Sequence, residues 1–269
     1  MTPGTGELRV EREGPIVTIA LNRPAKRNAL TPAMLSALDR GLAEADADAS
    51  VHVIVLTGVG DHFCAGFDLG GVDPEELVED RFNREREQLF DRALALRDLG
   101  TPTIASVRGA CVAAGLLLSQ MCDLVIAAED AFFYDPLPRM GGVGLEVMVE
   151  PWDIGIRRTK RYLFTGERIP ASAALEMGMV TDLAAPELLE EDTRALAERV
   201  AEMPPVTLAL LKRSLNRIQD VIGMREALEG HFFLHQFGHA TQESRELLHA
   251  AREGRSLPDY FRRRDEGKL

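Results

Sequence analysis

The sequence predicts an α/β protein in which a parallel sheet is followed by a helical C-terminal region. Short apolar runs rich in β-branched residues alternate with helical segments through the first two thirds of the 269 residues, and this order is typical of parallel sheets. After the glycine-rich stretch RMGGVGLE the chain is chiefly helical. Because no repeat or flexible linker separates these parts, we expect a core over 1–196 and a helical region over 197–269 that share an interface.

The N-terminal elements follow from turn and capping residues. Residues 7–21 contain two strands around the turn sequence REGP. Thr31 is a good N-cap before Pro32, and apolar residues continue at helical spacing as far as Leu42. Residues 51–58, VHVIVLTG, form an apolar strand that ends in glycine. In such a sheet the ligand crevice lies beyond the carboxyl ends of the strands.

The later elements are predicted in the same way. Residues 75–99 are charged and helical in character, 103–107 form a strand entered through Pro102, 112–121 form a helix, and 122–130 contain another buried strand. Helices then continue from SAALEMGMV through the stretch after Pro186, with a break at Pro204 and Pro205.

Composition excludes several classes of function. The chain is 45% apolar and 28% charged, and no apolar run approaches the about 18 residues that a membrane span needs, so we expect a cytoplasmic globular protein. Cys64, Cys111 and Cys122 have neither disulfide parity nor paired metal-ligand spacing, which indicates reduced thiols. The net charge of −12 disfavours a nucleic-acid partner. No complete G-x-G-x-x-G is present, which argues against a nicotinamide cofactor.

Two glycine-bearing loops follow apolar strands at matching places: DHFCAGFDLGG after 51–58 and RGACVAAGL after 103–107. The amide of Ala114 lies in the first turn of the predicted helix, where N–H groups lack helical partners, and the Cys64 region offers a second amide. Two such donors could hold a developing oxyanion. The alternative is that both are ordinary glycine turns.

The chain resembles the crotonase superfamily, the enoyl-CoA hydratase and isomerase family. The resemblance is carried by IALNRPAKRNAL, VIVLTGVGDHFCAGFDL, TPTIASVRGACVAAGLLLSQMCDLVIAAEDAFF and LFTGERIPASAALEMGMVTDL, in the family's order. It implies a spiral of ββα repeats and a helical region that forms trimers, often paired into hexamers. It also implies coenzyme A thioester substrates, no separate cofactor, and an oxyanion hole formed by the amides of Cys64 and Ala114.

The sequence departs from the family at the positions of the two catalytic glutamates. Hydratases carry one glutamate three residues after the second oxyanion donor and another after the next strand, and here these places hold Leu117 and Leu137. Leucine cannot transfer a proton or orient water. Relatives such as the aroyl-CoA dehalogenases place a working aspartate in the next loop, where Glu146 falls; Asp135 is a second candidate acid. The alternative for Glu146 is a solvated loop residue.

The resemblance also implies where coenzyme A binds. Arg23, Lys26 and Arg27 lie in the loop that runs along its nucleotide end in relatives, where positive side chains would pair with phosphates; the alternative is a solvated basic turn. The oxyanion loop is expected to contribute the remaining coenzyme A contacts, from His62, Ala65, Gly66, Phe67 and Asp68. Asp68 is expected to hydrogen-bond within its loop rather than to act as a base.

Three histidines recur every fourth residue in GHFFLHQFGHA: His231, His235 and His239. Such a stripe on one helical face can bind a metal. Gly230 and Gly238 weaken the helix, and no acidic ligand is apparent in the sequence nearby, so we expect a packed subunit contact and no metal.

These features lead to one functional hypothesis and one alternative. The first is an enzyme that polarises an acyl-CoA thioester through two amides and uses a non-standard acid, with Glu146 the leading candidate. The alternative is an acyl-CoA-binding or scaffold protein that keeps the pocket without turnover. The sequence does not distinguish hydration from isomerisation, ring opening or hydrolysis.

Overall fold

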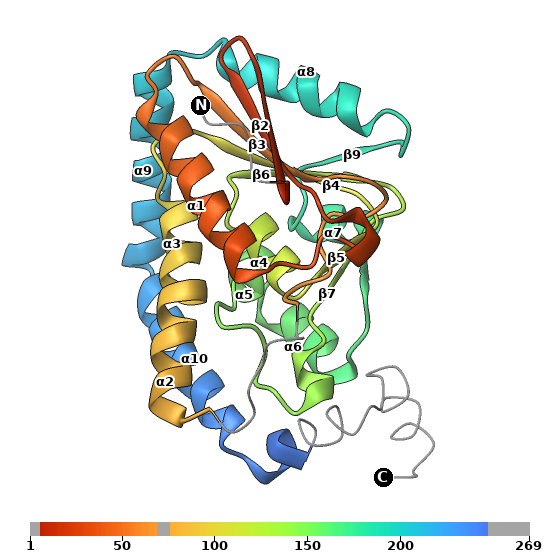
Figure 1. The fold of residues 1–269 in the computed structure, drawn as a ribbon, viewed down its shortest axis with the longest axis vertical. Helices are drawn as coiled ribbons and strands as arrows, with labels where there is room; N and C mark the ends of the chain where they lie inside the picture. Colours follow the sequence, from red (N-terminus) through yellow and green to blue (C-terminus); the bar gives the residue numbers. More distant parts are fainter. Residues whose placement is uncertain (1–5, 69–75, 247–269) are drawn as a thin grey trace.

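The structure, a computed structural model, describes residues 6–68 and 76–246. Its centre is a sheet in the order β1-β2-β3-β4-β6-β9 (Figure 1). β1 and β2 form an antiparallel hairpin, and the later neighbours pair in parallel, as the order of elements predicts. These strands are β1 (Leu8–Glu13), β2 (Ile16–Leu21), β3 (Val53–Gly58), β4 (Thr103–Val107), β6 (Leu124–Ala128) and β9 (Asp182–Ala184).

A smaller sheet lies beyond the carboxyl ends of β4 and β6. Its order is β5-β7-β8, from β5 (Ala110–Val112), β7 (Phe132–Tyr134) and β8 (Ile169–Pro170). The chain passes from β4 to β5 and then into a helix, and from β6 to β7 before the next helical segments. This repeated order is the spiral of ββα units that the sequence resemblance implies, and the fold prediction is confirmed.

Helices cover both faces of the large sheet because side chains alternate along its strands. Val53 and Val55 of β3 pack in a layer with helix α8, whereas Ile54 and Leu56 belong to the larger core. The helices are α1 (Pro32–Ala47), α2 (Val78–Glu85), α3 (Arg92–Arg97), α4 (Ala114–Gln120), α5 (Glu150–Asp153), α6 (Ile156–Thr165), α7 (Ala171–Met177), α8 (Leu189–Ala201), α9 (Pro205–Val221) and α10 (Met224–His239). A π-helical turn, η3 (Arg86–Asp91), joins α2 to α3, and short 3-10 turns are η1 (Pro24–Lys26) and η4 (Leu137–Met140).

Local signals placed several of these boundaries correctly. The Thr31 hydroxyl accepts a hydrogen bond from the Met34 amide at 3.1 Å, and Pro32 is the first residue of α1. The predicted helix over 112–121 is shorter than expected, because residues 110–112 pair with β7 as a strand and α4 begins at Ala114.

The predicted boundary between 196 and 197 falls inside α8. Leu189, Leu196 and Ala197 of this helix are buried against the sheet, so α8 belongs to the core layer above it in Figure 1. The helical region that follows therefore starts with α9, and 247–269 lie outside the described residues. Among the described helices, none has both the length and the apolar character needed to cross a membrane.

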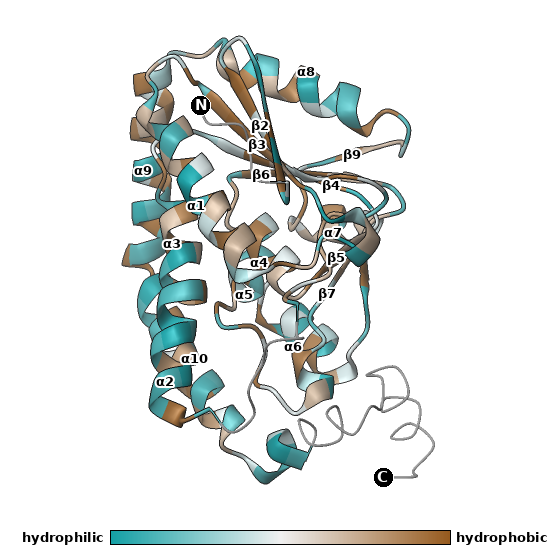
Figure 2. Ribbon diagram, in the orientation of Figure 1, coloured by the Kyte–Doolittle hydropathy of each residue, from teal (hydrophilic) through white to brown (hydrophobic). Residues whose placement is uncertain are grey.

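Helices α9 and α10 run along one side of the molecule, and apolar positions of α9 lie on its outer surface (Figure 2). In the isolated chain the exposed apolar side chains of these two helices include Val206, Leu210, Leu211, Leu215, Ile218, Val221, Phe233, Leu234 and Phe237. An exposed apolar surface of this extent is characteristic of a protein–protein contact.

Candidate functional site

The two glycine-bearing loops lie side by side because Cys64 and Cys111 form a parallel β-bridge. The Cys64 amide donates to Ala110 O at 3.1 Å, and the Val112 amide donates to Cys64 O at 2.9 Å. The Cys64 N–H is therefore occupied by the backbone and cannot bind a substrate oxygen. The prediction that Cys64 supplies an oxyanion donor is wrong, since it required a free amide.

The remaining amides of this loop identify a different donor. The Ala65 amide donates to Arg27 O at 2.9 Å, the Gly66 amide contacts Cys64 Sγ at 3.4 Å, and the Asp68 amide donates to Leu30 O at 2.9 Å. Phe67 and Leu30 form a parallel β-bridge in which the hydrogen bonds to Leu30 come from the flanking residues Gly66 and Asp68. The Phe67 N–H therefore points away from Leu30. Among the described residues, the Phe67 amide is left without an acceptor.

Ala114 supplies the second amide. The chain reverses at Ala113, whose φ of 50° is unusual for a residue with a side chain and whose amide donates to Tyr134 O at 3.0 Å. α4 begins at the next residue, and the Ala114 N–H has no acceptor within the described part of the chain. A Cβ on Gly66 would lie only 3.7 Å from the Ala114 nitrogen, so the Phe67 loop lies directly against this amide.

The carboxylate positions expected from hydratases are apolar in the structure as in the sequence. Leu117, on the first turns of α4, is 4% exposed and part of the core, and Leu137, the first residue of η4, packs against the core. Neither place offers a proton donor or acceptor, so acid–base chemistry must come from another group.

Asp135 is buried at the end of β7 and holds two loop segments together. Its Oδ1 accepts the Leu137 amide at 2.8 Å, and its Oδ2 accepts the Leu145 amide at 3.1 Å. Burial raises the pKa of Asp135 to about 7, with the nearby Glu146 charge adding to the shift. Asp135 is thus a carboxyl that titrates near neutral pH, yet both of its oxygens already accept backbone hydrogen bonds.

Glu146 is also buried, in contrast to the solvated alternative, and is 7% exposed. Burial raises its pKa, opposed by the neighbouring His235. Its Oε2 has no hydrogen-bond partner among the described residues. A buried carboxyl with an unsatisfied oxygen is costly for folding, which is characteristic of functional sites.

Glu150 is a third buried carboxyl, which the sequence reasoning missed. It begins α5, and burial together with the nearby Asp135 raises its pKa to about 8. Glu150 and Asp135 line one pocket with apolar and aromatic side chains from α4, β7 and α6, among them Leu116 and Tyr162. The only sequence signal was the pair Glu150–Pro151 at a helix start, which does not predict burial.

The expected coenzyme A residues divide into two groups. Lys26 and Arg27 are exposed at η1, on the loop whose Arg27 carbonyl accepts the Ala65 amide. Arg23 instead contacts protein groups: its Nη1 donates to Ala29 O at 2.6 Å and its Nη2 pairs with Asp68 Oδ2 at 3.0 Å. Asp68 therefore hydrogen-bonds to a loop side chain, as expected.

His62 and Cys64 have internal partners as well. The Ala110 amide donates to His62 Nδ1 at 3.2 Å, which ties this ring to the loop before α4. Burial raises the pKa of the Cys64 thiol to about 12, so Cys64 is an unreactive protonated thiol at neutral pH.

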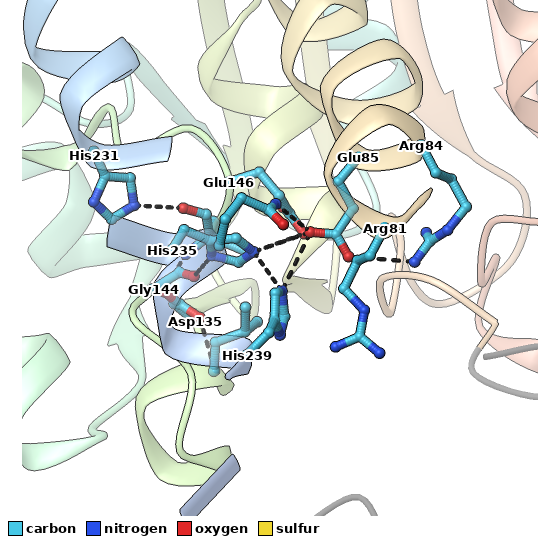
Figure 3. Close-up of polar contacts among 12 residues, drawn as sticks. Arg81, Arg84, Glu85, Asp135, Gly144, Glu146, His231, His235 and His239 are labelled. Carbon is cyan, nitrogen blue, oxygen red and sulfur yellow. Dashed lines mark hydrogen bonds and ion pairs between the residues drawn. The ribbon is translucent and has the colours of Figure 1, made fainter. Parts of the chain in front are cut away.

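The three histidines of α10 do not share the same contacts. His231 Nε2 lies 2.7 Å from Leu145 O, whereas His235 and His239 face Glu85 at the end of α2 (Figure 3). The expectation that no acidic residue joins these histidines is wrong, because α2 packs across α10 and brings in a residue far away in sequence. Although burial acts to raise the Glu85 pKa, hydrogen bonds from His235 and His239 hold it below its usual range.

The α/β fold places two backbone amides that have no acceptor among the described residues on adjoining loops, and comparison with known proteins identifies the family. Residues 11–258 match the model of the enoyl-CoA hydratase/isomerase family, and the chain belongs to this family. EchA13 of Mycobacterium tuberculosis, which carries an enoyl-CoA hydratase name, is 37% identical over 249 residues, covering 85% of this chain and 78% of its own.

Two further relatives extend this comparison. The 2,3-dehydroadipyl-CoA hydratase of Escherichia coli is 32% identical over 260 residues, covering 94% of this chain and 98% of its own. The crystal structure of a probable enoyl-CoA hydratase from Mycobacterium thermoresistibile is 39% identical and covers 87% of this chain and 97% of its own, with a TM-score of 0.83.

Proposed function

We propose that this protein is an enzyme that binds the carbonyl oxygen of an acyl-CoA thioester between the amides of Phe67 and Ala114. The observation that carries this proposal is a pair of N–H groups without an acceptor in the described part of the chain, on two loops joined by the parallel β-bridge between Cys64 and Cys111. The residues on either side of Phe67 are hydrogen-bonded to Leu30, and Ala114 opens α4, so both amides are positioned before negative charge develops on the oxygen. Each such donor contributes roughly 10²–10³ in rate.

Glu146 is the proposed acid or base. It is buried, burial raises its pKa, and Oε2 has no protein partner among the described residues, so this oxygen is available to exchange a proton with a substrate. Asp135 is the second choice, because its two oxygens already brace the loops around it. With Leu117 and Leu137 in place of the usual glutamates, we do not expect efficient hydration of simple straight-chain enoyl-CoA esters.

The proposed substrate class is a coenzyme A thioester whose acyl group is unsaturated next to the carbonyl. The name of the E. coli relative supports this class. The exposed side chains of Lys26 and Arg27, beside the loop of the Phe67 amide, supply positive charge for the phosphates of coenzyme A in a chain of net charge −12.

A mass-spectrometric screen of a broad panel of acyl-CoA thioesters tests the proposal. We expect at least one thioester to be consumed by the wild type, and we expect Glu146→Gln to lose turnover while it still binds that thioester. If no thioester reacts although coenzyme A esters bind, the second candidate, an acyl-CoA-binding protein without turnover, replaces the enzyme. The leucines at 117 and 137 are the observation that favours this second candidate.

We further propose that the chain assembles as a homotrimer or a hexamer through α9 and α10. The exposed apolar side chains of these helices support an assembled state, since a monomer would leave them in water. Light scattering coupled to size-exclusion chromatography gives the mass directly. A monomer at micromolar concentration would contradict this proposal.

A further inference from the structure

Three side chains of metal-binding type from two segments distant in the sequence meet inside the molecule. They are Glu85, the last residue of α2, and His235 and His239, one turn apart on α10. Glu85 and His235 are buried and His239 is partly buried, with side-chain exposures of 8%, 1% and 22%. Figure 3 shows all three side chains pointing toward one another.

The spacing of the donor atoms matches a tetrahedral metal site. His239 Nε2 lies 3.0 Å from His235 Nε2 and 3.2 Å from Glu85 Oε2, and His235 Nε2 lies 3.4 Å from Glu85 Oε2. Zinc binds imidazole nitrogen and carboxylate oxygen at about 2.0–2.2 Å, which places tetrahedral ligand atoms roughly 3.3 Å apart. An ion slightly outside the plane of these three atoms would therefore reach all of them without movement of the backbone.

The surrounding groups orient the donors for a cation. His235 Nδ1 lies 2.8 Å from Gly144 O, and because a carbonyl only accepts, Nδ1 carries a proton. Nε2 is therefore the nitrogen that faces the cluster, and its lone pair becomes available to a cation when its own proton leaves. Gln236 Nε2 donates to Glu85 Oε2 at 2.7 Å, and Arg84 Nη2 lies 3.4 Å from Glu85 Oε1. Such outer contacts are what fix imidazole and carboxylate ligands in metal sites.

A second carboxyl lies beside one of these donors. Glu146 Oε1 lies 3.8 Å from His235 Nε2, and Glu146 Oε2 is buried without a partner among the described residues. Glu146 lies outside the group of three donor atoms that are all within 4.8 Å of one another. Without a proton or a cation between Glu85, His235 and His239, the lone pairs of these three side chains repel one another in a low-dielectric environment.

We propose that Glu85, His235 and His239 bind a divalent transition-metal ion, with Glu146 beside the His235 ligand. Two imidazoles and a carboxylate are a donor set suited to zinc and to other first-row divalent metals. This proposal does not rest on the paired amides, and metal binding is measured without turnover, so its failure and the failure of the proposed function are distinguishable even though Glu146 lies beside His235.

The test uses the full-length, tag-free protein dialysed against EDTA, titrated with ZnCl₂ by calorimetry and with CoCl₂ by visible absorption. We expect one Zn²⁺ per chain and d–d bands of bound Co²⁺. His239→Gln removes one ligand at a partly exposed position and should weaken Zn²⁺ binding on the order of 100-fold. The matched control is His231→Gln, one turn earlier on α10, which should bind like the wild type because His231 faces Leu145.

Two results would overturn the proposal. One is a wild-type protein that binds neither ion, which would mean that the cluster shares a proton instead of a metal. The other is His239→Gln binding Zn²⁺ as tightly as the wild type, which would place the ion elsewhere. Should His239→Gln lower the melting temperature of the metal-free protein, Glu85→Gln provides a second ligand variant with the same expected loss of binding.

Discussion

Gly115, the second residue of α4, holds the two amide-bearing loops at contact distance. A Cβ at this position would lie 2.6 Å from Cys64 O and 2.7 Å from Cys64 Cβ. Ordinary contacts of this kind are about 3.5 Å, so Gly115→Ala forces the Cys64 loop away from α4 by roughly 0.9 Å. Because Phe67 follows in the same loop, the two proposed donors separate.

The magnitude follows from this displacement. Helix propensity alone predicts that Gly115→Ala stabilises the protein by about 1 kcal/mol. Overpacking of a rigid contact costs roughly 1–3 kcal/mol, and the clash here is with backbone, so we expect a net loss of stability. A misplacement of about 1 Å in a catalytic arrangement reduces the rate about 10²-fold. We therefore expect kcat/KM to fall about 100-fold and the melting temperature to decrease.

The assay measures kcat/KM with the most reactive thioester of the panel, together with the melting temperature. Gly41→Ala is the control, since its Cβ would lie 3.4 Å from Ile19 Cδ1 in ordinary contact within α1. The control should keep full activity and an unchanged or higher melting temperature. If Gly115→Ala keeps wild-type turnover and stability, the close approach of the two loops has no role in catalysis.

Further predictions concern the buried carboxyls and the strained residue before α4. Glu146→Gln should lower kcat at least about 100-fold with little change in thioester affinity, measured by steady-state kinetics and calorimetry; an unchanged kcat would assign the acid to another group. The raised pKa values of Asp135 (about 7) and Glu150 (about 8) mean that the folded state binds more protons than the unfolded state. The contribution of these two groups to stability is therefore largest below about pH 4 and is lost as the pH rises to about 8. Glu150→Gln should make the melting temperature decrease less steeply over this pH range. An equal slope in the variant would contradict the argument from burial. Ala113→Gly removes the strain of φ 50° and should raise the melting temperature by about 1–3 °C, whereas a lower value would show that the Ala113 methyl contributes more than the strain costs.

Local sequence patterns predicted most of the fold because the strands and caps depend on neighbouring residues. The β-branched run at 51–58 and the Thr31–Pro32 cap both led to correct elements. Val112 was predicted as the start of a helix, whereas it ends β5, because the pairing of this strand with β7 depends on a segment about twenty residues away. The same limitation placed the core boundary inside α8, whose burial depends on the sheet beneath it.

The candidate site was predicted less completely, for reasons of geometry. Cys64 was predicted as the donor although the structure places the available amide at Phe67, because the direction of a backbone N–H depends on which strand pairs with the loop, and the sequence does not contain that information. Glu85 lies in a charged helix with the composition of a surface segment, so nothing in the sequence indicated its burial beside α10. The sequence thus showed which residue types are present, but not which of them come together in the folded chain.

The central claim is that the Phe67 and Ala114 amides bind a thioester oxygen, and isotope-edited infrared spectroscopy measures this directly. The ligand is a saturated acyl-CoA labelled with ¹³C at the carbonyl, which binds without a double bond to react. The account predicts a C=O stretch below its value in water for the bound ligand, with most of this downshift lost in Gly115→Ala. A fully bound ligand whose carbonyl stretch stays at or above the value in water would contradict it.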